Sequence, residues 1–311
     1  MQIVVADPSR MVLKAVSQLL ECDGHTVDAF VDGREALGFT KSHRSVDALI
    51  TSTELGPMSG LELCRETRLL TGRDRAIYIV LMSSNADQKR LINALDGGAD
   101  EFIRKPPVKE ELYARLRSAE RQLRLQRELI RLATIDPLTG VFNRRAFFEQ
   151  TQHWCAPGKE PLAVAAIMFD VDHFKQVNDG YGHDVGDQVL RAIGRDAPSE
   201  GAVVGRLGGE EFAVLLEGSD IRAGIAHAEQ LRNKLAALSF DTARGRLSVT
   251  CSLGVAERRE GEAIDQLLKR ADAALYKAKN DGRNRVVAAD LSDFDFAEVQ
   301  WSRLLRRRRS T

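Results

Sequence analysis

The sequence has few of the residues that mark disulfide-rich, zinc-binding or membrane-spanning proteins. Its 311 residues include only 4 cysteines and 6 histidines. The cysteines show no metal-ligand spacing, so we interpret them as reduced thiols: Cys22, Cys64, Cys155 and Cys251. No apolar run approaches the roughly 20 residues that a membrane-spanning helix needs, and the first residues lack the zones of a signal peptide. These absences predict a cytoplasmic protein without a membrane span.

The chain also lacks a net charge, because Lys+Arg and Asp+Glu both number 45. A balanced charge gives no electrostatic reason to expect a nucleic-acid partner. Hydrophobic residues make up 43% of the chain and charged residues 29%, as in ordinary folded proteins. A chain of 311 residues is long for one core, so its length predicts two domains.

Strand-like and helix-like segments alternate over the first part of the chain, which we expect to form one domain over residues 1–108. This alternation predicts a parallel sheet with helices on both faces. The expected strands cover residues 3–6, 26–30, 48–50, 77–82 and 101–103. The expected helices cover residues 11–20, 33–39, 61–70 and 89–95.

A long helix without a breaker is expected next, over residues 109–135. Its apolar residues recur at 4-3-4 spacing, which is typical of the a and d positions of a parallel two-stranded coiled coil. We therefore predict a homodimer through this linker helix and the first domain, because the pattern is longer than that domain could cover. The alternative is a helix packed on its own domain. The pattern consists of Leu112, Leu116, Ala119, Leu123, Gln126, Ile130 and Ala133.

A second domain is expected over residues 136–288, followed by a tail over 289–311 that ends in a run of arginines. Such a run is usually a solvated tail, and contact with a membrane surface or a partner is the alternative. The expected strands of this domain cover residues 163–169, 203–207, 212–216 and 247–255. The expected helices cover residues 144–153, 185–194, 221–238 and 263–280.

Two motifs of the second domain combine glycines with carboxylates. Residues 207–212 read Leu-Gly-Gly-Glu-Glu-Phe, and an earlier apolar segment ends in Phe-Asp-Val-Asp at residues 169–172. Gly208 and Gly209 allow a backbone to approach a phosphate closely. The carboxylates of Asp170, Glu210 and Glu211 suit a hard divalent cation that shares its ligands with substrate phosphates. Together they predict nucleoside-triphosphate chemistry.

Residues 1–120 resemble the receiver domain of two-component response regulators. The resemblance implies a (βα)5 doubly wound α/β fold with strand order 2-1-3-4-5 and a site at the carboxyl ends of the strands. It is carried by Val5-Ala6-Asp7-Pro8-Ser9, by Gly-Pro-Met-Ser-Gly-Leu-Glu-Leu at 56–63, by Met82-Ser83-Ser84 and by Phe-Ile-Arg-Lys-Pro-Pro at 102–107.

The resemblance also indicates that this receiver is degenerate. In that family two acidic residues hold Mg²⁺, an aspartate accepts phosphate, and a hydroxyl residue and a lysine sense it. Asp7, Ser83 and Lys105 match this pattern, but Ala6 stands at the first acidic position and Ser52 at the acceptor position. Because a serine hydroxyl cannot form an acyl phosphate, we predict a pseudo-receiver that is not phosphorylated. Its expected role is dimerisation or partner binding, an inert remnant is the alternative, and its upstream regulator is unknown.

Residues 135–288 resemble the GGDEF-domain diguanylate cyclases along their whole length. The resemblance implies an α+β nucleotidyl-cyclase domain of the palm-like, ferredoxin-like kind. Six blocks in the family's order carry it: Asp-Pro-Leu-Thr-Gly at 136–140 with Asn-Arg-Arg at 143–145, Phe-Asp-Val-Asp-His-Phe-Lys at 169–175, residues 177–187, Arg-Leu-Gly-Gly-Glu-Glu-Phe at 206–212, Ser-Leu-Gly-Val-Ala at 252–256, and residues 271–279 ahead of Gly-Arg-Asn at 282–284.

The family activity condenses two GTP into cyclic di-GMP and releases two pyrophosphates. Carried over to this sequence, the resemblance implies two Mg²⁺ ions per active site, with Mn²⁺ as a possible substitute. The metal ligands would be Asp170, the Val171 carbonyl, Glu211 and Glu210, with Glu210 also a proton acceptor. The phosphates would meet Gly208, Gly209, the backbone of His173 and Phe174, and the side chains of Lys175, Lys279 and Arg283.

The resemblance implies guanine recognition by Asn178 and Asp187, because a carboxylate can accept from guanine N1–H and the exocyclic amine. Each domain would hold one GTP, so that two domains must face each other. The family's inhibitory Arg-x-x-Asp motif is replaced by Ser199 and Ala202, so weak or no feedback inhibition is expected. A catalytically silent GGDEF domain that binds GTP and acts through protein partners is the alternative.

Overall fold

The computed structural model of this protein describes residues 1–71, 75–84, 95–155 and 163–289, which form two compact units that divide between Arg131 and Leu132. The helix predicted over residues 89–95 lies outside the described residues except for Leu95, and so does the predicted tail except for Ala289. None of the helices in the described ranges is both long and apolar enough to cross a membrane. The predicted boundaries at residues 108, 135 and 288 stay predictions.

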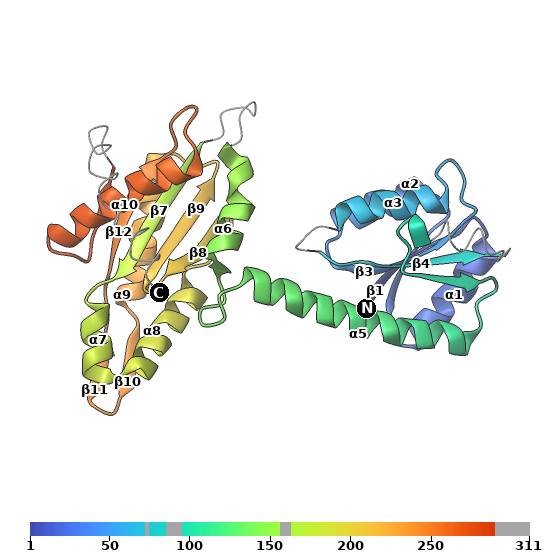
Figure 1. The fold of residues 1–311 in the computed structure, drawn as a ribbon, viewed down its shortest axis with the longest axis horizontal. Helices are drawn as coiled ribbons and strands as arrows, with labels where there is room; N and C mark the ends of the chain where they lie inside the picture. Colours follow the sequence, from blue (N-terminus) through green and yellow to red (C-terminus); the bar gives the residue numbers. More distant parts are fainter. Residues whose placement is uncertain (72–74, 85–94, 156–162, 290–311) are drawn as a thin grey trace. The chain divides into compact units, whose positions relative to one another are not determined.

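The first unit contains a five-stranded parallel sheet in the order β2-β1-β3-β4-β5 (Figure 1). This is the order that the resemblance to receiver domains implied, so the predicted fold class of this unit is confirmed. Its strands are β1 (Gln2–Ala6), β2 (Thr26–Phe30), β3 (Val46–Ser52), β4 (Tyr78–Ser83) and β5 (Glu101–Arg104).

Helices cover both faces of this sheet. α1 (Arg10–Cys22) and α5 (Lys109–Thr134) pack on one face, and α2 (Gly33–Ser42) and α3 (Gly60–Leu70) on the other (Figure 1). Successive side chains of a strand point to opposite faces. Strand β1 is therefore apolar from Ile3 to Ala6, where both of its faces are buried.

The apolar residues of α5 divide it into two parts. The prediction of one continuous dimer seam is wrong for its first four positions, because the core of the first unit covers them. These positions are at most 2% exposed: Leu112, Leu116, Ala119 and Leu123. Beyond them, three leucines at 4-3 spacing are 67%, 67% and 59% exposed, and none of them belongs to the predicted seam: Leu125, Leu129 and Leu132.

The second unit contains a six-stranded mixed sheet in the order β13-β12-β7-β9-β8-β6. The pairs β12–β13 and β6–β8 are parallel, and the other neighbours are antiparallel. The predicted α+β class is therefore confirmed. The strands are β6 (Phe142–Asn143), β7 (Val164–Val171), β8 (Ala202–Gly208), β9 (Glu211–Glu217), β12 (Cys251–Glu257) and β13 (Val286–Ala288), with a separate ribbon of β10 (Ser239–Thr242) and β11 (Gly245–Ser248).

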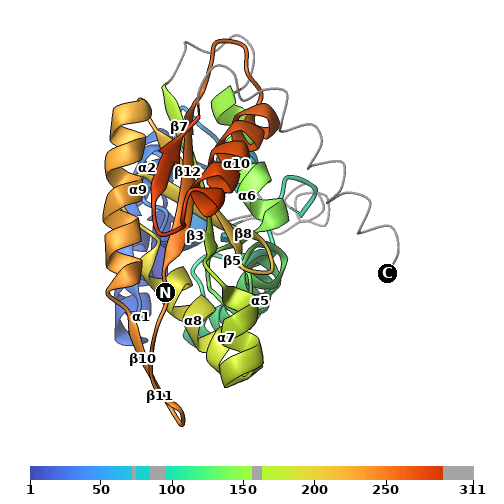
Figure 2. The same ribbon diagram turned by 90° about the vertical axis from the view of Figure 1, so that its left-hand side faces the viewer.

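Helices also cover both faces of the mixed sheet. Figure 2 shows α9 (Ile221–Ala236) and α10 (Ile264–Asn280) on opposite sides of it. α8 (His183–Asp196) shares the face of α9, and α6 (Arg144–Thr151) shares the face of α10. A Cβ added to Gly254 of β12 would lie 2.1 Å from the carbonyl oxygen of Ala271. Glycine therefore allows α10 to approach β12 at backbone distance.

One predicted strand of this unit is wrong, and one helix was not predicted. The strand expected over residues 247–255 is divided, because the Thr250 hydroxyl donates to the Asp172 carboxylate (2.7 Å) and the Thr250 carbonyl accepts from the Asp172 N–H (2.8 Å). We did not predict α7 (Phe174–Tyr181), whose eight residues bury only Phe174 and Val177 and so give a weak periodic signal.

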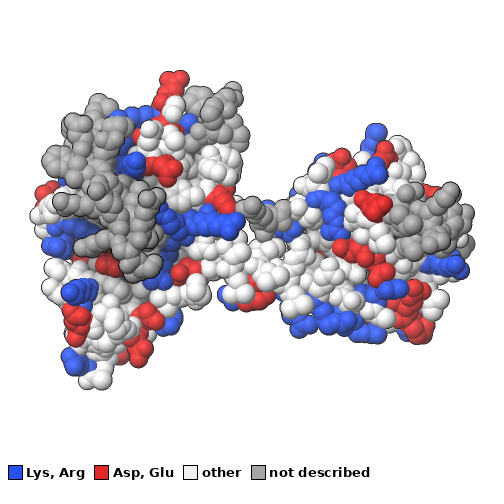
Figure 3. Space-filling view, in the orientation of Figure 1, with Lys and Arg blue, Asp and Glu red and all other residues white. Residues whose placement is uncertain are grey.

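Charged side chains of both signs are intermixed on the face of the molecule shown in Figure 3. Several charged side chains of the described residues form exposed ion pairs, such as Arg131 with Glu128 on α5 at 2.8 Å. Exposed pairs of this kind contribute little to stability. The described residues on this face therefore alternate between positive and negative charge and do not form one extended patch of a single sign.

Candidate functional site

Two of the predicted acidic residues face each other across neighbouring strands. Asp170 near the end of β7 pairs directly with Glu211 at the start of β9. Directly paired residues of antiparallel strands have Cβ atoms roughly 4.5–5.5 Å apart. Glu210 precedes Glu211 in the turn that links β8 to β9. The sheet register thus brings together three carboxylates from two motifs that are distant in sequence.

The turn that carries Glu210 is held by an ion pair. Gly209 has a φ of 54°, a left-handed conformation that glycine adopts without strain. Its carbonyl accepts from Nε of Arg206 at 2.8 Å, and Nη1 of Arg206 lies 3.0 Å from the Asp136 carboxylate. Burial alone would raise the pKa of Asp136, but hydrogen bonds from Thr139 and Arg206 hold it below its ordinary value. Asp136 and Arg206 belong to the family motifs, but the motifs alone did not indicate that they hold this turn.

Lys279 of α10 reaches the carboxylate cluster. Its Nζ lies 2.7 Å from Oδ2 of Asp170, whose residue is 6% exposed. Burial raises the pKa of Asp170 to about 7, Lys279 opposes this rise, and Glu210 and Glu211 add to it. Even with Lys279 beside it, the Asp170 carboxyl is therefore only partly ionised at neutral pH, and a further cation would favour its ionised form.

Asp272 is a further acidic residue near this cluster, and the sequence analysis gave it no role. It lies on α10, seven positions before Lys279. Burial, and then the charge of Glu211, raise the pKa of Asp272 to about 6. The sequence offered one signal for Asp272, since it lies in the block at residues 271–279 that resembles the GGDEF family. Only the packing of α10 on the sheet, however, brings its carboxylate towards Glu211.

The carboxylate cluster is compatible with a magnesium site that is completed by substrate. Among the described residues, no group of three or more His, Cys, Asp and Glu side chains is assembled to hold a metal ion. Mg²⁺ usually binds one or two carboxylates, several waters and substrate phosphates, and does not require a complete protein cage. Asp170 and Glu211 supply two such oxygen ligands from paired strands, so the residues present fit this ion.

The predicted phosphate-binding backbone lies immediately after β7. His173 has a left-handed φ of 57°, and α7 begins at the next residue, Phe174. The N–H groups of a first helical turn can bind anions, because they have no partner within the helix. Lys175 is exposed in the same turn. The structure therefore places these three predicted residues together, three to five positions beyond Asp170.

The two predicted guanine-recognition residues lie on the neighbouring helices α7 and α8. A Cβ added to Gly186 of α8 would lie 2.0 Å from Oδ1 of Asn178 on α7. Asn178 therefore packs directly against the residue that precedes Asp187. Asp187 is about half exposed and lies 3.6 Å from Arg191 on the same helix. The structure thus brings the predicted pair together on one helical hairpin.

The predicted residues of the degenerate receiver site also converge. Asp7 is fully buried beside the end of β1, and the Lys105 ammonium forms an ion pair with its carboxylate. The same ammonium donates to the Ser52 hydroxyl at 2.6 Å. Ala6 and Ser83 are the last residues of β1 and β4. An internal network of lysine, aspartate and serine therefore occupies the carboxyl edge of this sheet.

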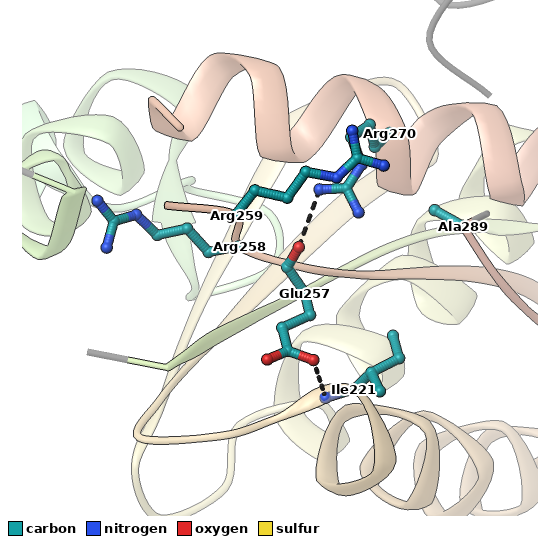
Figure 4. Close-up of a pocket in the computed structure, with 6 residues that line it drawn as sticks. All are labelled: Ile221, Glu257, Arg258, Arg259, Arg270 and Ala289. Carbon is teal, nitrogen blue, oxygen red and sulfur yellow. Dashed lines mark hydrogen bonds between the residues drawn. The ribbon is translucent and has the colours of Figure 1, made fainter. Parts of the chain in front are cut away.

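A cavity of about 340 Å³ lies in the second unit, at the end of the mixed sheet that is opposite to the carboxylate cluster (Figure 4). Glu257 in its lining pairs with Ala165 near the start of β7, whereas Asp170 pairs with Ser252. The Glu257 carbonyl accepts from Arg270, and its carboxylate accepts from the Ile221 N–H, both at 2.9 Å. We interpret these bonds as structural, because they join β12 to α9 and α10. The lining consists of Ile221, Glu257, Arg258, Arg259, Arg270 and Ala289.

Comparison with known families finds two matches that together cover most of the chain. A family model described as "Diguanylate cyclase, GGDEF domain" matches residues 133–285. A model described as "Response regulator receiver domain" matches residues 3–117. The suspected combination of the two domains is therefore confirmed.

Two curated relatives match this chain, one over most of its length and one over about half of it. Response regulator PleD of Caulobacter vibrioides is 34% identical over 258 residues, which are 78% of this chain and 56% of PleD. Diguanylate cyclase DgcM of Escherichia coli is 43% identical over 176 residues, which are 54% of this chain and 41% of DgcM. The chain thus spans about half the length of the curated relatives it matches.

A solved structure agrees with the second unit. The coiled coil and GGDEF domain of DgcB from Caulobacter crescentus, in complex with c-di-GMP, matches with a TM-score of 0.51 and 33% sequence identity. The match covers 57% of this chain and 99% of the DgcB chain. The fold of a GGDEF domain is therefore present in this protein.

Asp170→Asn should change the pH dependence of stability. The ordinary pKa of this carboxyl is 3.8, and its pKa in the fold is about 7. Because the folded state binds the proton more tightly, wild-type stability should fall as pH rises from about 4 to about 7 and then level off. The asparagine side chain of the variant does not titrate between pH 4 and pH 7. In metal-free buffer, the free energy of unfolding of the variant minus that of wild type should therefore increase across this pH range, by a few kcal/mol.

Urea unfolding at several pH values, followed by the fluorescence of the buried Trp154, measures this difference in the second unit. A stability difference between variant and wild type that does not change with pH would contradict the raised pKa of Asp170.

Proposed function

The chain is a response regulator in which a receiver domain is joined to a GGDEF domain, and from this membership we propose that it is a diguanylate cyclase. It would condense two GTP into cyclic di-GMP and release two pyrophosphates. The pairing of Asp170 with Glu211, beside an intact Gly-Gly-Glu-Glu-Phe turn, is the observation that carries this proposal. Similarity to DgcM and PleD supports it.

Two Mg²⁺ ions, or Mn²⁺ in their place, would be held by Asp170, Glu211 and the Val171 carbonyl, with Glu210 beside them. When bound, such ions would lower the pKa of a ribose 3′-hydroxyl and neutralise the departing pyrophosphate. The raised pKa of Asp170 supports this assignment, since the carboxylate needs a cation when it is ionised. Glu210, which is half-buried in the turn, would accept the proton of the attacking hydroxyl.

The protein's own cations would bind the triphosphate. Lys279 now pairs with Asp170 and is 31% exposed, so its flexible chain can turn to a phosphate once metal neutralises Asp170. Lys175 and the backbone N–H groups of His173 and Phe174 would contact the outer phosphates, and the planar guanidinium of Arg283 can donate to two oxygens. Gly208 and Gly209 would leave room for the phosphates along the turn.

Asn178 and Asp187 would select guanine. The Asp187 carboxylate can accept from N1–H and the exocyclic amine of guanine, and adenine lacks this pair of donors. A polar group left without its partner penalises the wrong base. The close contact between Asn178 and Gly186 supports this role, because it holds the amide beside Asp187.

A homodimer would complete the reaction centre, since each GGDEF domain would hold one GTP. Linking two such domains raises the effective concentration of the second half. The exposed leucines of α5 offer a seam for a second copy: Leu125, Leu129 and Leu132. Their 4-3 spacing supports parallel pairing of two copies of this helix. The seam we propose is therefore displaced from the one predicted from the sequence.

The receiver domain would work without phosphorylation. Ser52 replaces the acceptor, and Ala6 leaves Asp7 without its acidic neighbour. The Lys105 ammonium already binds Asp7 and Ser52, which supports a fixed internal network in place of a phosphate switch.

Incubation of the full chain with GTP and Mg²⁺ should yield cyclic di-GMP and pyrophosphate on nucleotide chromatography. Glu211→Gln should lower turnover by at least about 100-fold, because it removes a metal ligand of the two-ion site. Glu217→Gln is the matched control, since Glu217 is exposed at the far end of the same strand.

Added product should not slow the reaction, because Ser199 and Ala202 replace the inhibitory motif. GTP binding without product would instead indicate the silent module.

Leu129→Glu should weaken the dimer and lower specific activity by about tenfold at low protein concentration, because like charges would meet at an apolar seam. Sedimentation and activity should be measured at matched concentrations. Leu69→Glu on α3 is the control, since Leu69 is 79% exposed and Leu129 is 67% exposed. Equal effects of the two substitutions would contradict the proposed seam.

A small phosphodonor with Mg²⁺ should leave the wild-type receiver unmodified, as measured by intact mass. The double variant Ala6→Asp/Ser52→Asp should gain a base-labile acyl phosphate, because it restores both missing carboxylates of the family site. Ala6→Asp alone should gain none. Covalent phosphate on the wild-type receiver domain would refute the pseudo-receiver proposal.

A further inference from the structure

Asp172 joins three separate segments of the second unit, and nothing above gives it a role in the reaction. It is 6% exposed and lies just beyond β7. Its carboxylate accepts from the Ser252 hydroxyl at 2.6 Å, the Thr250 hydroxyl at 2.7 Å and the Asn284 N–H at 3.0 Å. One buried carboxylate thus connects the end of β7, the start of β12 and the turn after α10.

The turn after α10 has an unusual backbone. Arg283 and Asn284 have φ values of 63° and 45°, so two consecutive non-glycine residues are left-handed. This conformation is sterically unfavourable for side chains with a Cβ, although asparagine tolerates it better than most. Such a turn persists only where surrounding contacts hold it.

Hydrogen bonds at each residue hold this turn. The Arg283 N–H donates to the Ala278 carbonyl at 3.0 Å, and the Asn284 amide oxygen accepts from Arg232 at 2.8 Å. The Asn284 N–H donates to Asp172. The bond to Asp172 is the one that ties the turn to the strand that bears Asp170.

Asp172 therefore fixes the position of Arg283 relative to Asp170, and the proposed reaction needs both residues at the same GTP. It lies two residues from Asp170 in the chain, and it binds the backbone of the residue that follows Arg283. Both restraints are short, so a shift of the carboxylate would move Arg283 relative to the carboxylate cluster. Hydrogen bonds to a carboxylate are also stronger than bonds between neutral groups.

We propose that Asp172 is a positioning residue that fixes the left-handed turn at Arg283 and Asn284, so that the Arg283 guanidinium meets the outer phosphates of GTP. This inference rests on the proposed function, because it assumes GTP in the cleft. Asp172 itself touches no substrate. It acts through the backbone of Asn284 and thereby through Arg283.

Asp172→Asn tests this role with little change of shape. The variant loses the negative charge of the acceptor, so the bond to the Asn284 N–H becomes weaker. The amide oxygen can accept from Thr250 and Asn284 only if the NH₂ group donates to the Ser252 hydroxyl, and the reversed amide would place two donors together at Asn284. The turn should then relax and Arg283 should leave the phosphates. We expect affinity for a non-hydrolysable GTP analogue to fall about tenfold in calorimetry, while affinity for GMP, which lacks the outer phosphates, stays unchanged.

A double-mutant cycle separates this role from a general effect on folding. If Asp172 acts through Arg283, Asp172→Asn should cause no further loss of affinity for the GTP analogue in a protein that already carries Arg283→Ala. Asn284→Gly should recover part of the affinity lost in Asp172→Asn, because glycine adopts a left-handed conformation without strain. Ser252→Ala, which removes one donor without adding another, should cause a smaller loss with the same preference for the analogue over GMP.

The outcomes separate this inference from the proposed function. If wild type and Asp172→Asn bind the analogue equally well, the positioning role is overturned and the proposed function stands. The same holds if Asp172→Asn loses affinity for GMP to the same extent as for the analogue. An undiminished effect in the Arg283→Ala background would overturn it too. If wild type does not bind the analogue, both proposals fail.

Discussion

The antiparallel pairing of β7 with β9 is the constraint on which the catalytic half of this protein depends. Its register sets Asp170 directly opposite Glu211. Two carboxylates at that spacing repel each other unless a cation lies between or beside them. In the structure Lys279 supplies that cation at 2.7 Å from Asp170, and in the proposed reaction metal ions would take its place. The site is thus built around a negative charge that the fold alone only partly neutralises.

An ion pair and a set of hydrogen bonds to a buried carboxylate hold the loops that surround this pair. Arg206 links the Gly209 carbonyl to Asp136, and so ties the glycine turn to the segment that follows α5. Asp172 ties the end of β7 to the turn that carries Arg283. Both contacts use buried or half-buried carboxylates with several donors, which are strong only while every partner is in place. The loops that would bind substrate are therefore fixed to the sheet at defined points.

The receiver domain keeps the framework of its family, whereas two residues of the family site are replaced, by Ala6 and Ser52. Its five-stranded sheet has the family order, yet Lys105 bonds to Asp7 and Ser52 where a phosphorylated aspartate would otherwise stand. The first half of α5 completes the receiver core, and the second half exposes a different set of leucines. This helix therefore packs within its own domain over its first half and exposes leucines over its second half, where we propose that a second copy binds.

The sequence by itself determined the two fold classes, because apolar periodicity is a local signal, and its resemblance to the receiver family supplied the strand order of the first unit. Its motifs also supplied the candidate site residues, whose roles stay predictions. It did not determine which side of α5 is buried, because a regular apolar stripe looks the same whether a domain core or a second helix covers it. The sequence also did not indicate the break before β12 or the role of Asp172. Asp172 and Asn284 are 112 positions apart, and a hydrogen bond over that separation leaves no periodic trace. Only tertiary structure decides such contacts, since they depend on which segments the sheet brings side by side.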